Sequence, residues 1–331
     1  MDILYPEYYN AFRCIAGACP DSCCKEWSVD VDPEAVCFYR GLGGPLGDRL
    51  REVLQDTPDG TVMTIENGRC PMWRQDGLCR IQAELGHDAL CKTCREFPRL
   101  RHDYGNFVEL GLELSCPEAA RLILNDTEGL WEIQVEAGKG VAEYDEEMMG
   151  ILRRTRGEFT DFLNSTSLSV SQVLAVLLLY AYDVQGELDG GEPAVLSPEQ
   201  YLQDVEKLPL QGDIASLQAF FRGLEILTPQ WDIRLQNVGN APVWDGRFKA
   251  LVRYFINRYW LQAVSDYDIV CRVKLAVSAC ILIGFLGGDF TETAQLFSKE
   301  IENDPDNVET ILDGAYTARG LTDLNLLGLL I

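Results

Sequence analysis

Cysteine is the residue type whose number and spacing indicate chemistry in this chain. Four thiols, Cys14, Cys19, Cys23 and Cys24, fall within eleven residues, beside glycine, proline, aspartate and serine. A hydrophobic core can use cysteine as a small apolar side chain, but its neighbours are then usually apolar too. Loops that contain glycine and proline instead allow several sulfur atoms to meet at one metal ion or iron–sulfur cluster. The run therefore indicates metal ligation.

Two more thiols, Cys70 and Cys79, lie on either side of the turn signal Gln75-Asp76-Gly77. The turn Asn67-Gly68 should deliver Cys70, and the second turn should bring Cys79 back towards it. An excess of cations surrounds this region: Arg69, Arg74, Arg80, Lys92, Arg95, Arg99 and Arg101. These cations could form a solvated surface, or they could balance anionic thiolates or an anionic ligand.

Cys91 and Cys94 fall in a predicted helix over 88–97 that Asp88 should cap, and a spacing of three residues places both on one helix face. They could share a ligand or merely pack. Cys116 follows Ser115 in an S-x-x-E capping pattern, which predicts Ser115 as the N-cap and Cys116 as the first helical residue. The positive end of the helix dipole should lower the pKa of Cys116 and favour its thiolate. Cys116 is therefore the best-motivated single ligand.

The cysteines are unevenly distributed, with ten of the twelve before residue 117 in a chain of 331 residues. This distribution predicts two domains, a cysteine-rich domain over 1–125 and a second domain over 126–331. The apolar fraction of 47% is ordinary for a globular protein with a sizeable core.

A formal net charge of −24 argues against binding to nucleic acid, whose phosphates an acidic protein repels. The N-terminus lacks a charged start followed by an apolar run, so we expect a cytoplasmic protein in a reducing compartment. In such surroundings clustered cysteines are more often metal ligands than disulfides. The apolar stretches 173–182 and 275–286 are shorter than the roughly 20 residues of a membrane span, so they predict core helices and no membrane contact.

Short strands and hairpins should position the cysteines of the first domain. Alternation over 27–31 predicts a strand, Asp32-Pro33 predicts a helix start, and 97–101 with 107–114 predicts a hairpin. Beyond residue 125 helical periodicity dominates, over 146–163, 171–182, 197–205, 214–227, 245–261, 267–286, 293–301 and 307–318. The predicted fold is mainly α: a cysteine-rich α+β metal-binding domain with short hairpins, followed by an all-α helical domain. In the helix over 245–261 we expect the aromatic residues in the core and the cations in solvent.

Several mechanisms are excluded or weakened. Only His87 and His102 are present, so a histidine-rich metal site is excluded, and no phosphate-binding loop of the G-x-x-x-x-G-K-[ST] kind occurs. The spacing typical of radical S-adenosylmethionine enzymes fails because Glu26 stands where a third thiol should follow Cys19 and Cys23. An all-thiolate site remains, suited to a [4Fe-4S] cluster or to zinc. The dispersed thiols favour iron–sulfur.

The chain resembles the flagellin lysine-N-methylase family, which belongs with the CxxCxxCC zinc/iron-chelating proteins. The motifs that carry the resemblance are Cys14…Cys19…Cys23-Cys24-x-x-Trp27-x-Val29, Cys70-Pro71…Asp76-Gly77-Leu78-Cys79-Arg80, Thr93-Cys94-Arg95-x-Phe97-Pro98-Arg99, Leu114-Ser115-Cys116-Pro117-Glu118, and Tyr267-Asp268…Val273-Lys274 after Arg253-Tyr254-Phe255.

The resemblance implies S-adenosylmethionine-dependent methylation of lysine on flagellin or a similar protein, with a [4Fe-4S] cluster held by the N-terminal cysteines. The thiols that match the family pattern are Cys14, Cys19, Cys23, Cys24, Cys70, Cys79, Cys94 and Cys116. Cys91 stands where the pattern is more often polar, and Cys37, Cys271 and Cys280 lie outside it. The intervals after Cys14 and Cys19 are wider than in CxxCxxCC, so the choice of four ligands stays open.

Two classes of function are compatible with these residues. As a methyltransferase, the protein must lower the lysine pKa from about 10.4, and Arg95, Arg99 or Arg101 could bind the carboxylate of the methyl donor. The alternative is an iron–sulfur or zinc module for electron transfer or protein interaction, without catalysis. A protein with a purely structural zinc ion is a third hypothesis. The sequence predicts neither the base nor the oligomeric state.

Overall fold

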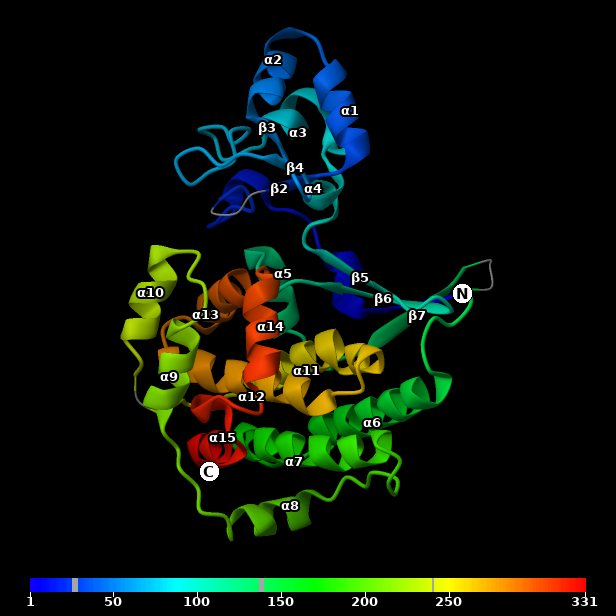
Figure 1. Cartoon of the computed structure of the whole chain (residues 1–331), viewed down its shortest axis with the longest axis vertical. Helices are drawn as coiled ribbons and strands as arrows, with labels where there is room; N and C mark the ends of the chain where they lie inside the picture. Colours follow the sequence, from blue (N-terminus) through cyan, green and yellow to red (C-terminus); the bar gives the residue numbers. More distant parts are fainter. Residues whose placement is uncertain (26–28, 137–139, 240) are drawn as a thin grey trace.

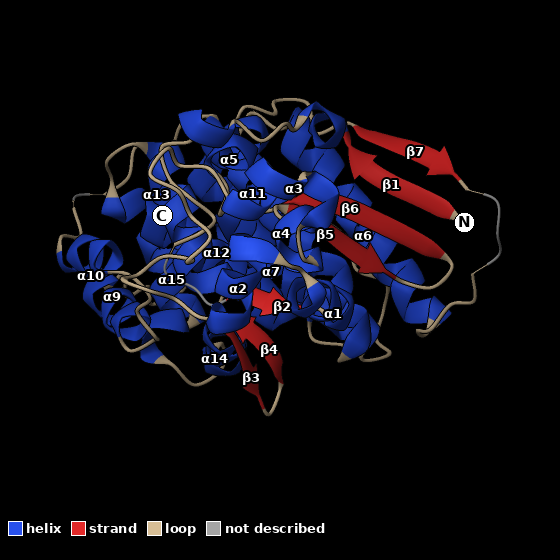
Figure 2. Ribbon diagram, turned by 90° about the horizontal axis from the view of Figure 1, so that it is seen from above, coloured by secondary structure: helices blue, strands red, loops and turns tan. Residues whose placement is uncertain are grey.

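A computed structural model of the chain describes residues 1–25, 29–136, 140–239 and 241–331. This part of the chain is mainly α, as predicted, with fifteen α-helices and two small sheets (Figures 1 and 2). Trp27 and Ser28, at the start of the strand predicted over 27–31, lie outside the described residues, and the rest of that strand is present.

A small α+β unit forms one end of the molecule, at the top of Figure 1. Its elements are β2 (Val29–Val31), α1 (Pro33–Gly41), α2 (Gly44–Val53), β3 (Leu54–Thr57), β4 (Gly60–Met63), α3 (Arg80–Leu85) and α4 (Lys92–Glu96). The strands form an antiparallel sheet in the order β2-β4-β3. Its core is separate from that of the rest of the molecule and includes Tyr39, Leu50, Met72 and two cysteines, Cys70 and Cys91.

A four-stranded sheet follows, in the order β5-β6-β1-β7 (Figure 2). Its strands are β1 (Asp2–Pro6), β5 (Arg99–Asp103), β6 (Phe107–Leu112) and β7 (Trp131–Val135). The predicted hairpin is confirmed as the antiparallel pair β5 and β6, whereas β1, parallel to β6 and antiparallel to β7, was not predicted. The N-terminal residues therefore join strands from two later parts of the chain.

The helical part surrounds one large core. Its α-helices are α5 (Pro117–Leu124), α6 (Glu146–Ser165), α7 (Val170–Leu188), α8 (Pro198–Val205), α9 (Ile214–Arg222), α10 (Pro229–Gln236), α11 (Arg247–Tyr259), α12 (Ile269–Leu286), α13 (Phe290–Phe297), α14 (Pro305–Gly314) and α15 (Asp323–Leu330). Within the described ranges, α12 alone is long and apolar enough to cross a membrane, and 94% of its apolar window is buried inside the protein. It is thus a central core helix.

Candidate metal centre and the adjoining cavity

Six thiols of the α+β unit lie within electrostatic range of one another. We call them the thiol cluster: Cys23, Cys24, Cys70, Cys79, Cys91 and Cys94. The Cys24 thiol lies next to those of Cys23 and Cys70, and the Cys70 thiol donates to the Met63 sulfur at 3.3 Å. The structure therefore joins residues from four separate stretches of sequence, including Cys91, which the family pattern had left out.

Two turns position the thiols of Cys70 and Cys79, as the sequence predicts. Asn67 and Gly68 both adopt positive φ, and after this turn the Cys70 amide donates to the Cys24 carbonyl at 2.7 Å. Gly77 has φ of 80°, in the left-handed region that glycine adopts without strain. The turn around it pairs Trp73 with Cys79 as a β-bridge. The predicted turn between Cys70 and Cys79 is thus confirmed.

Asp32 positions the other pair. Its carboxylate accepts from the Ala35 amide as N-cap of α1, as predicted, and from the Lys92 amide at 2.6 Å. The prediction of one helix from Asp88 to residue 97 is wrong: a 3-10 turn ends at Ala89, and α4 starts at Lys92 with Cys91 as N-cap. The first turn of α4 still brings Cys91 and Cys94 together, and the Cys94 thiol donates to Cys91.

These hydrogen bonds separate the acidities of the thiols. The bond from Cys24 lowers the pKa of Cys70 below the usual value, and the bond from Cys94 lowers that of Cys91. The pKa of Cys94 is raised instead. Its contact with Cys91 favours the protonated thiol, and burial raises the pKa further. Cys70 and Cys91 are therefore the first thiols of the cluster to ionise.

Three further predicted ligands border the cluster. Cys19 lies in electrostatic range of Cys14 and Cys23, and Cys116 in range of Cys19 and Cys23. We call the thiol cluster together with Cys14, Cys19 and Cys116 the thiol network. Gly17, between Cys14 and Cys19, lies against the turn that carries Gly77.

The predicted acidity of Cys116 is corrected by the structure. Helix α5 starts at Pro117, so Cys116 is the N-cap, while the Ser115 hydroxyl donates to Glu113 instead of capping the helix. Burial raises the pKa of Cys116 to about 11, and the N–H groups of Ala119 and Glu118 offset this only in part. The desolvation of the thiolate outweighs the helix dipole here.

The donor chemistry of the network fits a thiophilic metal or cluster, since its ligating atoms are sulfur. Among the residues that the structure describes, no three histidine, cysteine, aspartate or glutamate side chains already converge closely enough to hold a metal ion. The direct thiol contacts are pairwise, as between Cys24 and Cys70. Metal binding would therefore have to draw neighbouring pairs together.

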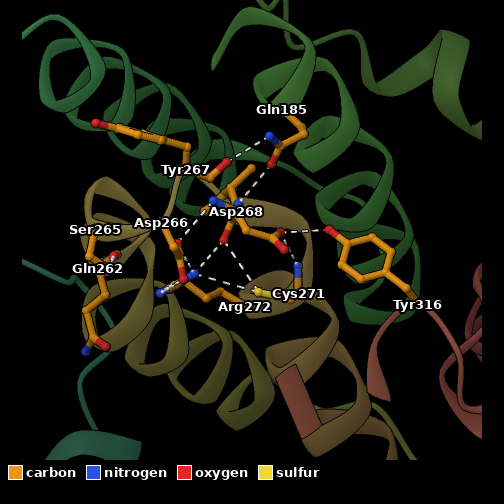
Figure 3. Close-up of polar contacts among 10 residues, drawn as sticks. Gln185, Gln262, Ser265, Asp266, Tyr267, Asp268, Cys271, Arg272 and Tyr316 are labelled. Atoms are coloured by element: carbon orange, nitrogen blue, oxygen red, sulfur yellow. Dashed lines mark hydrogen bonds and ion pairs between the residues drawn. The ribbon is translucent and has the colours of Figure 1, made fainter. Parts of the chain in front are cut away.

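The remaining cysteines lie elsewhere. Cys37 is exposed on α1, and Cys280 is buried in α12. Figure 3 shows the surroundings of Cys271: Arg272 donates to both carboxylate oxygens of Asp266 at 2.8 and 2.9 Å, and the Tyr316 hydroxyl donates to Asp268 at 2.7 Å. These contacts anchor the start of α12, and Cys271 belongs to them rather than to the thiol network.

The three arginines predicted for the donor carboxylate do not form one group. Arg95 donates to the Leu90 carbonyl within the α+β unit. Arg99 lies 5.1 Å from the ring of Phe12, and Arg101 pairs with Asp103 at 2.9 Å on β5. Their places in the structure favour local stabilising roles.

A cavity of about 560 Å³ lies where the cysteine segment meets α5 and α13; we call it the α13 cavity. Four of its lining residues each directly follow a cysteine of the network: Ile15, Pro20, Lys25 and Pro117. Its opposite wall is formed by α13 and the π-helical turn Ser298–Glu302. Sequence reasoning missed this cavity, because its walls are far apart in the chain.

Asp21, between Cys19 and Cys23, connects the two walls. Its carboxylate accepts from Lys25 at 3.2 Å, from Lys299 at 3.1 Å and from Gln295 at 3.3 Å. Burial raises the pKa of Asp21, but the ammonium of Lys299 and the other donors outweigh it and hold the pKa below the usual value. Asp21 therefore remains charged and attaches the cysteine segment to the helical part.

Comparison with known proteins gives curated relatives for part of the chain. It is 33% identical over 138 residues to the flagellar biosynthetic protein FliU of Salmonella muenchen, a match that covers 38% of this chain and 78% of that protein. Lysine-N-methylases of Salmonella typhimurium and Salmonella choleraesuis match at the same identity, but the chain spans only 33% of their length. No family model and no solved structure matches. The chain belongs to the family of FliU and these lysine-N-methylases.

Proposed function

We propose that the protein is a lysine N-methylase that acts on flagellin or a similar flagellar protein in the cytoplasm, with S-adenosylmethionine as donor and a cysteine-ligated [4Fe-4S] cluster. The observation that carries this proposal is the thiol network, which occurs in a relative of proteins named lysine-N-methylase and flagellar biosynthetic protein. Zinc is the alternative metal.

The reaction transfers one methyl group. A lysine ammonium first loses a proton to solvent water, and the nitrogen lone pair then attacks the methyl carbon of the sulfonium donor. The carbon–sulfur bond breaks, its electrons remain on sulfur, and S-adenosylhomocysteine leaves together with a methylammonium. The acidic surface of a protein with net charge −24 favours a lysine-rich partner.

The cysteine network supplies the residues for the cluster, with Cys70 and Cys91 as the thiols that ionise first. A bound cluster would cross-link the cysteine segments and fix the wall of the α13 cavity. The residues that follow Cys14, Cys19, Cys24 and Cys116 form that wall, so a change at the thiols changes the shape of the cavity.

Anaerobic purification with iron and zinc analysis tests the metal. We expect a brown protein with iron and sulfide and visible absorption, whereas a colourless zinc protein would contradict the cluster. Incubation with S-adenosylmethionine and flagellin, followed by mass spectrometry of tryptic peptides, should show methylated lysines. Calorimetry that finds no affinity for the donor in metal-loaded protein would contradict methylation.

A non-catalytic metal module is the second candidate, for electron transfer or protein interaction. The alignment covers only 33% of the lysine-N-methylases, so shared residues cover only part of an active relative. This candidate predicts a metal-loaded protein that binds flagellin without binding the donor. The calorimetry above therefore distinguishes the two.

A further inference from the structure

The α13 cavity has the size of a site for a small organic ligand. Its volume of about 560 Å³ falls within the range of roughly 300 to 1,000 Å³ that is usual for such sites. Both walls carry charged side chains, and apolar residues such as Leu296 and Pro117 lie among them. The lining therefore suits a polar ligand that also carries some apolar surface.

One end of the cavity offers charges of both signs at close range. The ammonium groups of Lys25 and Lys299 both meet Asp21, and Gln295 holds its amide between Asp21 and the Ser115 carbonyl at 2.7 Å. Gln295 is only 8% exposed, so this group is built into the protein rather than lying on its surface. Two ammonium groups beside a carboxylate and an amide suit a zwitterionic amino acid, whose carboxylate and ammonium need opposite partners.

Carboxylates stand at the other end, at the start of α13. Asp289 and Glu292 line the cavity there, and Lys299 lies seven residues beyond Glu292. A helical rise of 1.5 Å per residue separates them by about 10 Å along the axis. Carboxylates at such positions accept hydrogen bonds from the hydroxyl groups of a ribose, as nucleotide-binding folds use them.

We propose that the α13 cavity binds an amino acid joined to a nucleoside, and that this ligand is the methyl donor S-adenosylmethionine. Its aminocarboxylate contacts Lys25, Lys299 and Asp21, and its ribose hydroxyls contact Asp289 and Glu292. The sulfonium then lies between, along the wall formed by residues that follow the cysteines. This assignment rests on the proposed methylase function, since it names where the donor of that reaction binds.

Calorimetry with two ligands tests the orientation. 5′-Methylthioadenosine has the base and ribose of the donor but lacks the aminocarboxylate. Lys299→Met in metal-loaded protein should weaken S-adenosylmethionine about tenfold, because a charge-assisted hydrogen bond is lost, and should leave 5′-methylthioadenosine within about twofold. Asp289→Asn combined with Glu292→Gln should weaken both ligands, while the asparagine still caps α13.

Lys207→Met is the matched control, since Lys207 pairs with Asp204 at the end of α8 and should affect neither ligand. If Lys299→Met lowers the metal content, the same two ligands are titrated into Lys25→Met protein that has a normal metal content, and this variant then tests the site. If the wild-type protein and every cavity variant bind the donor equally well, the α13 cavity is not the donor site. That result would overturn this inference and leave the methylase proposal intact. Wild-type protein that binds neither ligand would overturn both.

Discussion

Individual thiols differ in this network because each hydrogen bond has a direction. The neighbouring Cys24 thiol lowers the pKa of Cys70, whereas Cys24 and burial raise the pKa of Cys23. Cys91 similarly takes the anionic position of its pair with Cys94. A metal would therefore meet Cys70 and Cys91 first, as the thiols that lose their protons most readily.

Replacement of Cys91 by serine should reduce the bound metal, because its thiol is buried among the other cysteines and is 2% exposed. Iron and zinc per protein, with the visible spectrum, measure the loss. Cys37→Ser is the control, since that thiol is exposed on α1 outside the network. Equal metal content in both variants would show that Cys91 is only a core residue.

Asp32 predicts a pH dependence of stability. The amide of Lys92 and then that of Ala35 stabilise its charged form, so its pKa is lowered in the folded protein. A lowered pKa contributes stability above the unfolded value of about 3.9, and this contribution is lost as the pH falls through the folded value. Asp32→Ala should cost about 1 to 2 kcal/mol at neutral pH and progressively less below pH about 4. Urea unfolding at several pH values measures it, and a pH-independent difference would contradict this origin.

At the scale of elements, segments with a helical period or a helix-start signal were predictable, including the eight-residue helices α8 and α13. The helices over 146–163 and 171–182 appear as α6 and α7. Helices α10 and α15, which also have eight residues each, were not predicted. Strand β7 was missed, although Trp131, Ile133 and Val135 alternate with polar residues; it lies at the edge of the sheet, with Ile133 and Val135 exposed.

The expectation that the cations of α11 face solvent is wrong for two of them. Arg253 is 4% exposed, and Arg258 pairs with Glu302 at 3.1 Å in the interior. Glu302 also accepts from the hydroxyls of Tyr254 and Tyr259. The partner lies in the π-helical turn, more than forty residues away, so no local pattern could reveal this pair.

Glu302→Gln should destabilise the protein by about 2 to 4 kcal/mol, because it removes the carboxylate paired with the buried guanidinium of Arg258 and leaves only Glu113 as a nearby counter-charge. Tyr254→Phe keeps that ion pair and should cost only about 1 kcal/mol. Chemical denaturation of both variants, followed by circular dichroism, compares them. A similar small loss in both would indicate that water replaces the lost carboxylate.

At the scale of the whole molecule, the candidate site joins two separately packed parts. The sequence predicted the turn between Cys70 and Cys79, since turn residues act locally. It could not locate the contact from Asp21 to Lys299, which spans 278 residues, or the cavity beside it. Such features depend on how the cysteine segment packs on α13, and composition and spacing carry no information about that packing.

Metal removal should loosen the α+β unit before the helical part. Among the described residues the unit has a core of thirteen buried side chains, two of them cysteines, against the much larger core around α12. So small a core needs cross-links or a metal for stability.

After chelation we expect rapid hydrogen exchange over 29–98 and a weakened contact at Asp21, while α7 and α12 stay protected and most of the helical circular dichroism remains. Mass spectrometry of deuterated peptides measures this, with Cys37→Ser protein as the control. Uniform exchange throughout the chain after chelation would mean that the two parts unfold as one cooperative unit.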